Sequence, residues 1–323
     1  MFKKMAFLAV FAFLVLICAA MPASAHSLMM LAGDNITDAS EADINDYLIS
    51  PGVQSIIIVG GHGYEYDFGN TSGPLTVVIT APDGTTKSVT TRTVSENITN
   101  VLSGGQSVLS YQQVNVTFDQ EGIYYLSTSL NETSTSNNQT TTTTQISKMM
   151  VFVGTGTWDG WARDLGLPLE IIPYTRVGGL ASGEALYGKV VANGTGVGNI
   201  TFYGEPVNTA AEAKQRYDEI KTAYPQIGED IYLIYSKRAY TDASGDFVST
   251  PSESGVWMYV AASNQTADGH SYKTTLTVPV LTPLSESSAA GANSDSEKTV
   301  PGFELIVGVL AVIGVVLFIY RKK

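Results

Sequence analysis

Short apolar stretches rich in β-branched and aromatic residues recur through the first half of the chain, and Gly, Pro and Asp-Gly turns separate them. They occupy residues 53–59, 75–80, 88–94, 108–118, 123–129 and 146–153. Regular short strands with turn signals are typical of an all-β sandwich. We therefore predict an N-terminal β-sandwich domain at residues 26–156. Residues 131–144 are rich in Ser, Thr and Asn and lack an apolar period, so we expect a flexible loop there.

A second region of strands follows an inter-domain bridge at residues 157–175. The bridge contains two tryptophans and two proline stops: Trp158, Trp161, Pro168 and Pro173. Beyond it, apolar stretches at 184–192, 200–203, 231–235, 255–260 and 272–280 predict a C-terminal Ig-like or transthyretin-like β domain at 176–282. Asn208 as N-cap, a run of alanines and Pro225 predict a helical insertion near 208–224. Residues 283–300 read as a polar stalk.

The two ends of the chain predict export and anchoring. Residues 1–25 have an early cationic pair, an apolar run and an Ala23-Ser24-Ala25 cleavage site, as in a secretory signal peptide. Residues 301–323 have an apolar run that three cations follow, as in a transmembrane helix whose end stays inside the cell. Cys18 is the only cysteine and lies in the leader, so the mature chain has neither disulfides nor Cys ligands.

The net charge and the glycosylation sequons fit an exported protein. The net charge is −12, and without the basic ends the region between them is still more acidic, so we exclude a nucleic-acid partner. Nine Asn-x-Ser/Thr sequons are present. We expect Asn115 and Asn199 to be unused because they lie in strand-like runs. The predicted glycosylation sites are Asn35, Asn70, Asn97, Asn131, Asn138, Asn193 and Asn264.

Two of the three histidines are candidate metal ligands. If the leader is cleaved after Ala25, His26 offers an α-amine and an imidazole that can chelate one ion, and His62 can add a second imidazole. A nitrogen-rich set suits Ni, Co or Cu. Glu65 and Asp67 are nearby carboxylates that can ligate the ion or support a ligand. The alternative reading makes His26 a frayed terminus and His62 a turn residue, and we expect the third histidine, His270, to be a turn residue.

Catalytic signatures are weak by comparison. The sequence contains no G-x-S-x-G, H-E-x-x-H, or phosphate-binding glycine loop. The bridge carboxylates could serve glycoside chemistry, but we prefer a linker held by salt bridges to Arg163 and Arg176, with the tryptophans as packing anchors. The carboxylates in question are Asp159, Asp164 and Glu170. We therefore predict a non-enzymatic protein.

The tail resembles the PGF-CTERM sorting signal of archaeal surface proteins. The resemblance covers Pro301, Gly302 and Phe303, the apolar segment and the basic end. It implies an archaeal cell surface and an archaeosortase-type enzyme that replaces the helix with a lipid anchor.

A second resemblance covers most of the region between the ends. The segments 166–173 and 181–184, the early Ala25-His26 and Gly61-His62 pairs, and the Thr241 turn before Trp257 are similar to the NikM-like family. That family has no known function and was once labelled a nickel-uptake component. The resemblance implies capture of a transition metal for a transporter. The alternative is a glycosylated structural or adhesion component that contacts other envelope proteins.

Overall fold

The computed structural model describes residues 27–36, 39, 43–61, 73–99, 105–136, 139–156, 158–207, 210–223, 225, 237–263 and 269–283.

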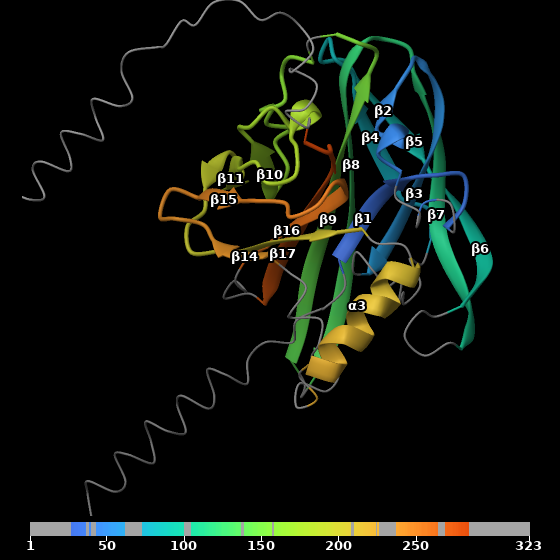
Figure 1. Ribbon diagram of the computed structural model, residues 1–323, viewed down its shortest axis with the longest axis vertical. Coiled ribbons are helices and arrows are strands. Elements are labelled where there is room, and N and C mark those ends of the chain that lie inside the picture. The colour runs from blue at the N-terminus through green and yellow to red at the C-terminus, as the bar shows by residue number, and fades with distance from the viewer. Residues whose placement is uncertain are drawn as a thin grey trace, which may run out of the picture. The chain divides into compact units, whose positions relative to one another are not determined.

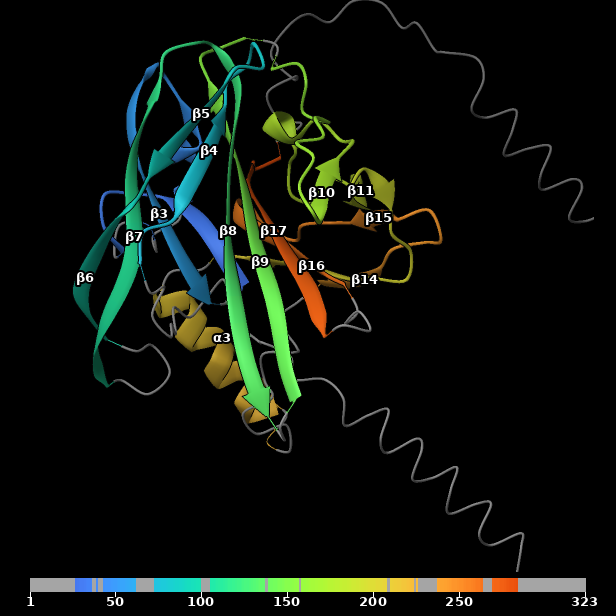
Figure 2. The ribbon, with the colours of Figure 1, turned by 180° about the vertical axis from the view of Figure 1, so that it is seen from behind.

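Two long strands form the centre of the fold. Strands β8 (Gly122–Ser136) and β9 (Gln139–Val153) pair antiparallel along their whole length (Figure 2). Their central residues are buried on both faces of the sheet. A strand covered on both faces needs apolar residues at successive positions, which explains the continuous apolar runs there.

The prediction of a flexible loop at residues 131–144 is wrong, because these residues extend β8 and β9. Their register runs to Ser136↔Gln139, and Thr135 and Thr140 lie opposite each other with hydroxyl oxygens 3.2 Å apart. Threonine is β-branched and favours extended backbone. A Thr-rich segment therefore forms a hairpin when its own second half supplies the pairing partner, although its composition alone suggests disorder.

β8 and β9 belong to a nine-stranded sheet that crosses the whole described region (Figure 1). Its order is β14 (Lys237–Tyr240), β13 (Thr201–Pro206), β16 (Gly255–Ala262), β17 (His270–Val280), β9, β8, β4 (Thr76–Thr80) and β5 (Thr86–Thr90), and β2 (Leu48–Ile49) also pairs with β9. β17 and β9 pair in parallel, from His270↔Thr142 to Thr277↔Met149.

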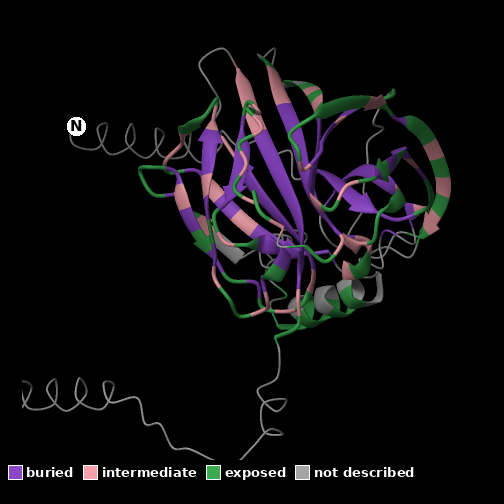
Figure 3. Cartoon of the chain, turned by 90° about the horizontal axis from the view of Figure 1, so that it is seen from above, coloured by how far each residue is buried: buried purple, intermediate pink, exposed green. Residues whose placement is uncertain are grey.

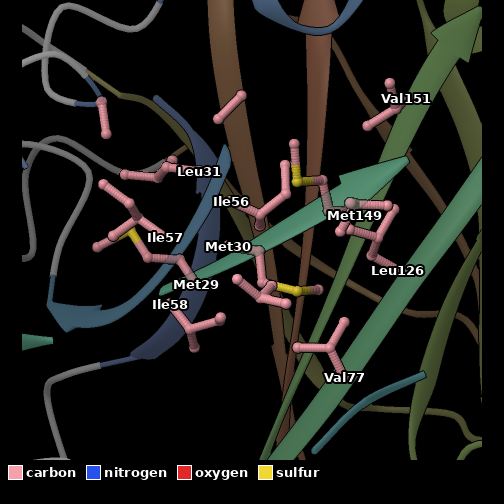
Figure 4. Packing of buried hydrophobic residues seen from close by; sticks show 14 of the residues in the cluster. Met29, Met30, Leu31, Ile56, Ile57, Ile58, Val77, Leu126, Met149 and Val151 are labelled. Atoms are coloured by element: carbon pink, nitrogen blue, oxygen red, sulfur yellow. The ribbon is translucent and has the colours of Figure 1, made fainter. Parts of the chain in front are cut away.

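A four-stranded sheet covers one face of the large sheet. Its order is β1 (Ser27–Ala32), β3 (Gly52–Gly61), β7 (Gln106–Phe118) and β6 (Arg92–Thr99). The first core lies between the two sheets, where the side chains of β1 and β3 meet those of β8 and β9 (Figure 4). Its labelled residues include Met29, Met30, Ile56, Leu126 and Met149.

A small sheet covers the other face of the large sheet. It contains β10 (Glu170–Pro173), β11 (Leu186–Ala192), β12 (Thr195–Gly196) and β15 (Asp246–Ser249). The second core lies between these sheets and includes Tyr125, Phe202, Phe247 and Trp257. Figure 3 shows that buried residues are concentrated in the inner strands and that exposed residues lie toward the outside. The molecule is therefore mostly β, with several sheets.

One α-helix is described, α3 (Ala210–Ala223), within the range 208–224 where we predicted it. Short 3-10 helices cover Ile44–Asp46 and Val177–Gly179. Among the described residues, no helix is long and apolar enough to cross a lipid bilayer. The predicted leader and tail, and all of the predicted stalk except Pro283, lie outside the described residues.

The large sheet contains strands from both sides of the predicted bridge. Strand β9 comes from the predicted N-terminal domain and its neighbour β17 from the predicted C-terminal domain. All described residues belong to one compact unit that ends at Pro283. The two-domain division stays a prediction, and the observed strands on the two sides of residues 157–175 share one sheet.

Candidate functional site

The predicted metal ligands His26, His62, Glu65 and Asp67 lie outside the described residues. The strands that lead to the two histidines are described. Ser27, the first residue of β1, is the register partner of Gly61, the last residue of β3. Gly61 has a φ of 149°, a conformation that favours glycine. Among the residues that the structure does describe, no group of three or more His, Cys, Asp and Glu side chains could hold a metal ion.

β1 is an edge strand, yet it is buried along its whole length. All six residues from Ser27 to Ala32 are buried, and β3 pairs with only one side of the strand. On the other side, Leu28 N donates to Gln145 Oε1 at 2.6 Å, and Thr275 Oγ1 donates to Leu28 O at 2.7 Å. Side chains of the large sheet thus bond the backbone N–H and C=O of Leu28, which no neighbouring strand pairs on this side. A buried backbone group without a partner would cost about 1–3 kcal/mol.

The two side chains that bond Leu28 also make hydrogen-bonding contacts with their neighbours. Gln145 Nε2 donates to Glu132 Oε2 at 2.6 Å, and Thr275 Oγ1 lies 3.0 Å from Ser147 Oγ. We call Glu132, Gln145, Ser147 and Thr275 the amino-terminal clamp. Its members come from three neighbouring strands, β8, β9 and β17, and face β1 together because the register of the large sheet aligns them.

A buried lysine lies in the same sheet. Lys273 on β17 is 7 % exposed, and Glu205 on β13 is 1 % exposed. Burial lowers the pKa of Lys273 to about 8, although the charges of Glu205 and Glu132 act in the opposite direction. Lys273 could have been noticed in the sequence, because it interrupts an otherwise apolar and β-branched strand.

The burial of Lys273 makes the stability of the protein depend on pH. Because the native pKa is below the unfolded value of 10.5, the unfolded chain binds more protons between about pH 8 and 10.5, and stability rises with pH there. We expect the difference in unfolding free energy between wild type and Lys273→Met to change by about 3 kcal/mol across this window. Urea unfolding at several pH values measures it. The exposed Lys87→Met is the control, and an unchanged difference for Lys273→Met contradicts the prediction.

The bridge is fixed by a buried ion pair. Lys148 Nζ on β9 lies 2.5 Å from Glu170 Oε1, and both side chains are fully buried. Glu170 Oε2 also accepts hydrogen bonds from Leu165 N at 3.0 Å and Leu167 N at 3.3 Å. Burial raises the pKa of Glu170 and lowers the pKa of Lys148, and the attraction between them opposes both shifts.

The predicted ion partners of the bridge are therefore wrong for Glu170, whose partner is Lys148 rather than Arg163 or Arg176. Arg163 instead donates to two backbone carbonyls that follow β4, Ala81 O and Pro82 O, each at 3.1 Å. Spacing favoured arginines close in sequence, whereas the small sheet packs on the large sheet and brings Glu170 to a residue 22 positions away. The sequence signal for this ion pair was Lys148, a single lysine inside the apolar run 146–153.

The tryptophans of the bridge are packing anchors, as predicted. Trp158 packs edge-on against Phe152, with ring centroids 5.4 Å apart, and its indole N–H donates to Val153 O. The indole N–H of Trp161 donates to Tyr174 O at 3.0 Å. Both rings contact the second core. Glu170 is enclosed in its ion pair and cannot reach a polysaccharide at the surface.

The described sequon asparagines lie mainly in solvent. Asn97, Asn131 and Asn193 are exposed, and Asn35 is half-buried. Asn70, Asn138 and Asn264 lie outside the described residues. Asn115 is also exposed, because strand β7 alternates its side chains between core and solvent, and Asn199 is exposed at a bend before β13 rather than in a strand. Strand position alone is thus no reason for a sequon to be unused, and glycan occupancy stays a prediction.

The third histidine does not lie in a turn. His270 is the first residue of β17, where it pairs with Thr142. Its Nε2 lies 2.9 Å from Thr144 Oγ1, and its ring centroid is 4.7 Å from that of Tyr272. The contact with Thr144 places the His270 side chain against β9 of the long hairpin.

The fold and site define a mostly β protein in which one large sheet is covered on both faces and the first strand is clamped by side chains. The chain belongs to the family described as a domain of unknown function (DUF4198), which matches residues 23–265. No curated protein matches it at a significant level.

Several solved structures show a remote likeness. They include α-2-macroglobulin from Salmonella reacted with methylamine (13 % identity, 81 % of this chain, 15 % of that chain, TM-score 0.21). The D0-D1 domain of intimin is similar over 72 % of this chain and 95 % of its own, with 11 % identity and a TM-score of 0.18. α-2-Macroglobulin from Escherichia coli activated by porcine elastase gives 12 % identity, 80 % and 20 % coverage and a TM-score of 0.20. This chain therefore spans a small part of the macroglobulins.

Proposed function

We propose that this protein is an archaeal cell-surface ectodomain that captures a transition-metal ion, Ni, Co or Cu, for uptake and has no enzymatic activity. The α-amine and imidazole of His26 and the imidazole of His62 would bind the ion, with Glu65 and Asp67 as carboxylate ligands or supports. The observation that supports this most is the pairing of Ser27 with Gly61, because His26 directly precedes Ser27 and His62 directly follows Gly61.

The pairing of Ser27 with Gly61 limits how far apart the residues next to them can be. Paired residues of antiparallel strands have Cα atoms about 4.5–5.5 Å apart, and consecutive Cα atoms are about 3.8 Å apart. Chain geometry therefore allows at most about 13 Å between the Cα atoms of His26 and His62. Random placement on a chain of this size would allow much larger separations. Two imidazoles that start this close can converge on one ion at about 2 Å from each nitrogen.

The cell-surface part of the proposal relies on the ends of the chain. Leader removal would create the chelating His26 terminus, and the PGF-CTERM-like tail would hold the ectodomain at the membrane before an archaeosortase-type enzyme replaces it. The ectodomain would comprise two Ig-like or transthyretin-like sandwiches. The NikM-like resemblance adds a metal transporter as the expected partner.

Metal titration of the mature chain tests the proposal. We expect the chain that begins at His26 to bind Ni²⁺ or Cu²⁺, and the His26→Ala, His62→Ala double variant to lose that binding. His270→Ala is the matched control, because it removes an imidazole on β17 and should leave binding unchanged. A chain with one alanine added before His26 should bind more weakly, since its α-amine is displaced. Equal binding by wild type and the double variant, measured by calorimetry, would contradict the proposal.

A glycosylated structural or adhesion component is the second candidate. The exposed sequon asparagines and the long Thr-rich hairpin of β8 and β9 favour it. Asn131 lies on that hairpin, where an attached glycan would shield the outer edge of β8 beyond its pairing with β4. Glycopeptide analysis of protein from the native envelope tests this candidate, and unmodified asparagines throughout would contradict it.

A further inference from the structure

We infer that the side chains of Lys148 and Glu170 join through a covalent amide bond, which ties the small sheet to the large one. Lys148 lies on β9 of the large sheet and Glu170 on β10 of the small sheet. Both side chains are fully buried, and Nζ lies 2.5 Å from Oε1. The ion pair is the state from which the bond forms, so a chain that has just folded is still unlinked. The inference does not depend on metal binding.

The two atoms that react are held close together. Cδ of Glu170 is one bond beyond Oε1, so Nζ of Lys148 lies at most about 3.7 Å from it. Two backbone carbonyls of the bridge also face the amine, Ile171 O at 3.2 Å and Arg163 O at 3.4 Å. These contacts keep the amine beside the carboxyl group, and such positioning raises the rate of a reaction as a very high local concentration would.

Burial favours the uncharged groups that react. It lowers the pKa of Lys148 and raises the pKa of Glu170, although the attraction between the two charges opposes both shifts. A proton can therefore pass from the ammonium to the carboxylate, which leaves a nucleophilic amine beside a neutral acid. In water this condensation is unfavourable because both ions are well hydrated. Here the ions have already lost that hydration, and a neutral amide costs much less to bury than two charges.

Two backbone N–H groups of the bridge lie where negative charge develops during the reaction. Leu165 N donates to Glu170 Oε2 at 3.0 Å, and Leu167 N donates to the same oxygen at 3.3 Å. When Nζ attacks Cδ, the electron pair of the C=O bond moves to Oε2, and these two donors stabilise the oxyanion.

The protons and electrons of the condensation balance without a further reactant. Oε1 already carries the first proton from the ammonium, and a second proton passes from the nitrogen to Oε1 after the attack. The Cδ–Oε1 bond then breaks, Oε1 leaves as water, and the C=O bond to Oε2 forms again. Of the three ammonium protons, two leave with the water and one stays on the amide nitrogen, where Ile171 O can accept it.

A covalent link would have a structural use in this chain. The sequence contains a single cysteine, so no disulfide can form within the chain. An amide between β9 and β10 closes residues 148–170 into a ring and restricts the unfolded chain, as a disulfide does.

A second lysine–carboxylate pair provides a control within the same molecule. Lys189 Nζ lies 3.6 Å from Asp246 Oδ1, and the two side chains are 27 % and 47 % exposed. Water keeps both of these groups charged, and a protonated amine is no nucleophile. We therefore expect this pair to stay ionic.

Mass spectrometry of the full chain, made without glycosylation and recovered unfolded in urea, tests the inference. The unfolded chain should have the mass of its sequence, and after refolding and incubation the mass should fall by that of one water molecule. Trypsin does not cleave after a lysine whose amine is blocked, so digestion should leave residues 93–163 joined to residues 164–176. Cleavage after Lys189 should stay complete. Lys148→Arg is the matched variant, because it keeps the cation without a reactive amine, and its mass should not change on refolding.

The joined peptides in refolded wild type are the expected result. Refolded wild type that keeps its full mass and yields a free peptide ending at Lys148 overturns the inference and leaves the ion pair in place. An equal loss of water in Lys148→Arg also overturns it, since the water then comes from another site such as an Asp-Gly sequence. If Lys148→Arg does not refold, the peptides of wild type decide alone. None of these outcomes bears on metal capture by the histidines.

Discussion

Glutamine in place of Glu170 is expected to lower the free energy of unfolding by about 3–5 kcal/mol, because it leaves a charged lysine buried without its counterion. Lys148 Nζ has three oxygen neighbours within 3.4 Å, and Glu170 is the only anionic one. Glutamine keeps the shape and can still accept from Leu165 N. The loss therefore reports the charge rather than a cavity. Urea unfolding followed by tryptophan fluorescence measures it.

A double-mutant cycle isolates the pair. Lys148→Met alone should also destabilise, since it leaves the Glu170 carboxylate buried without its lysine. The double variant Lys148→Met, Glu170→Gln should lose much less than the sum of the single losses, because no charge is then buried. The partly exposed pair Lys189–Asp246, 3.6 Å apart, is the control, and Asp246→Asn should cost less than about 1 kcal/mol. Additive losses in the cycle would show that the two groups do not act as a pair.

The strands were largely predictable from the sequence, whereas their partners were not. The predicted run 123–129 falls within β8, and 146–153 falls within β9. Alternation and turn residues are local, so they can be read from neighbouring positions. The parallel pairing of β9 with β17 joins residues more than 120 positions apart, and no local pattern encodes it. For this reason the sequence did not indicate that strands on the two sides of the predicted bridge share one sheet.

The candidate site was likewise only partly predictable from the sequence. The sequence indicated His26 and His62 as ligands, because histidine and a processed terminus are chemical features of single residues. It did not indicate the amino-terminal clamp, since Gln145 and Thr275 become relevant only when two strands meet beneath Leu28. Lys148 and Lys273 were available as signals, because charged residues rarely occur within strands that are otherwise buried. The residues that face these two lysines can be identified only from the fold.

Alanine in place of Phe202 is expected to lower the free energy of unfolding by about 3–5 kcal/mol. Phe202 lies on β13 of the large sheet and is fully buried. Its ring stacks on Phe247 of the small sheet, with centroids 3.8 Å apart, and also faces Tyr259 on β16 at 5.7 Å. Truncation would remove an aromatic ring from the joint between the two sheets, and rigid strands on either side prevent the cavity from collapsing.

The same variant tests whether the two predicted β domains unfold together. Phe202 and Phe247 both come from the predicted C-terminal domain, but the sheet that holds Phe202 continues into β9 of the N-terminal one. Damage at this joint should therefore shift one cooperative transition to lower urea, seen equally by fluorescence and circular dichroism. Val248→Ala is the control, because Val248 follows Phe247 and is 51 % exposed, so its loss should stay within about 0.5 kcal/mol. Two separated transitions in Phe202→Ala would instead mean that the shared sheet does not couple its two halves.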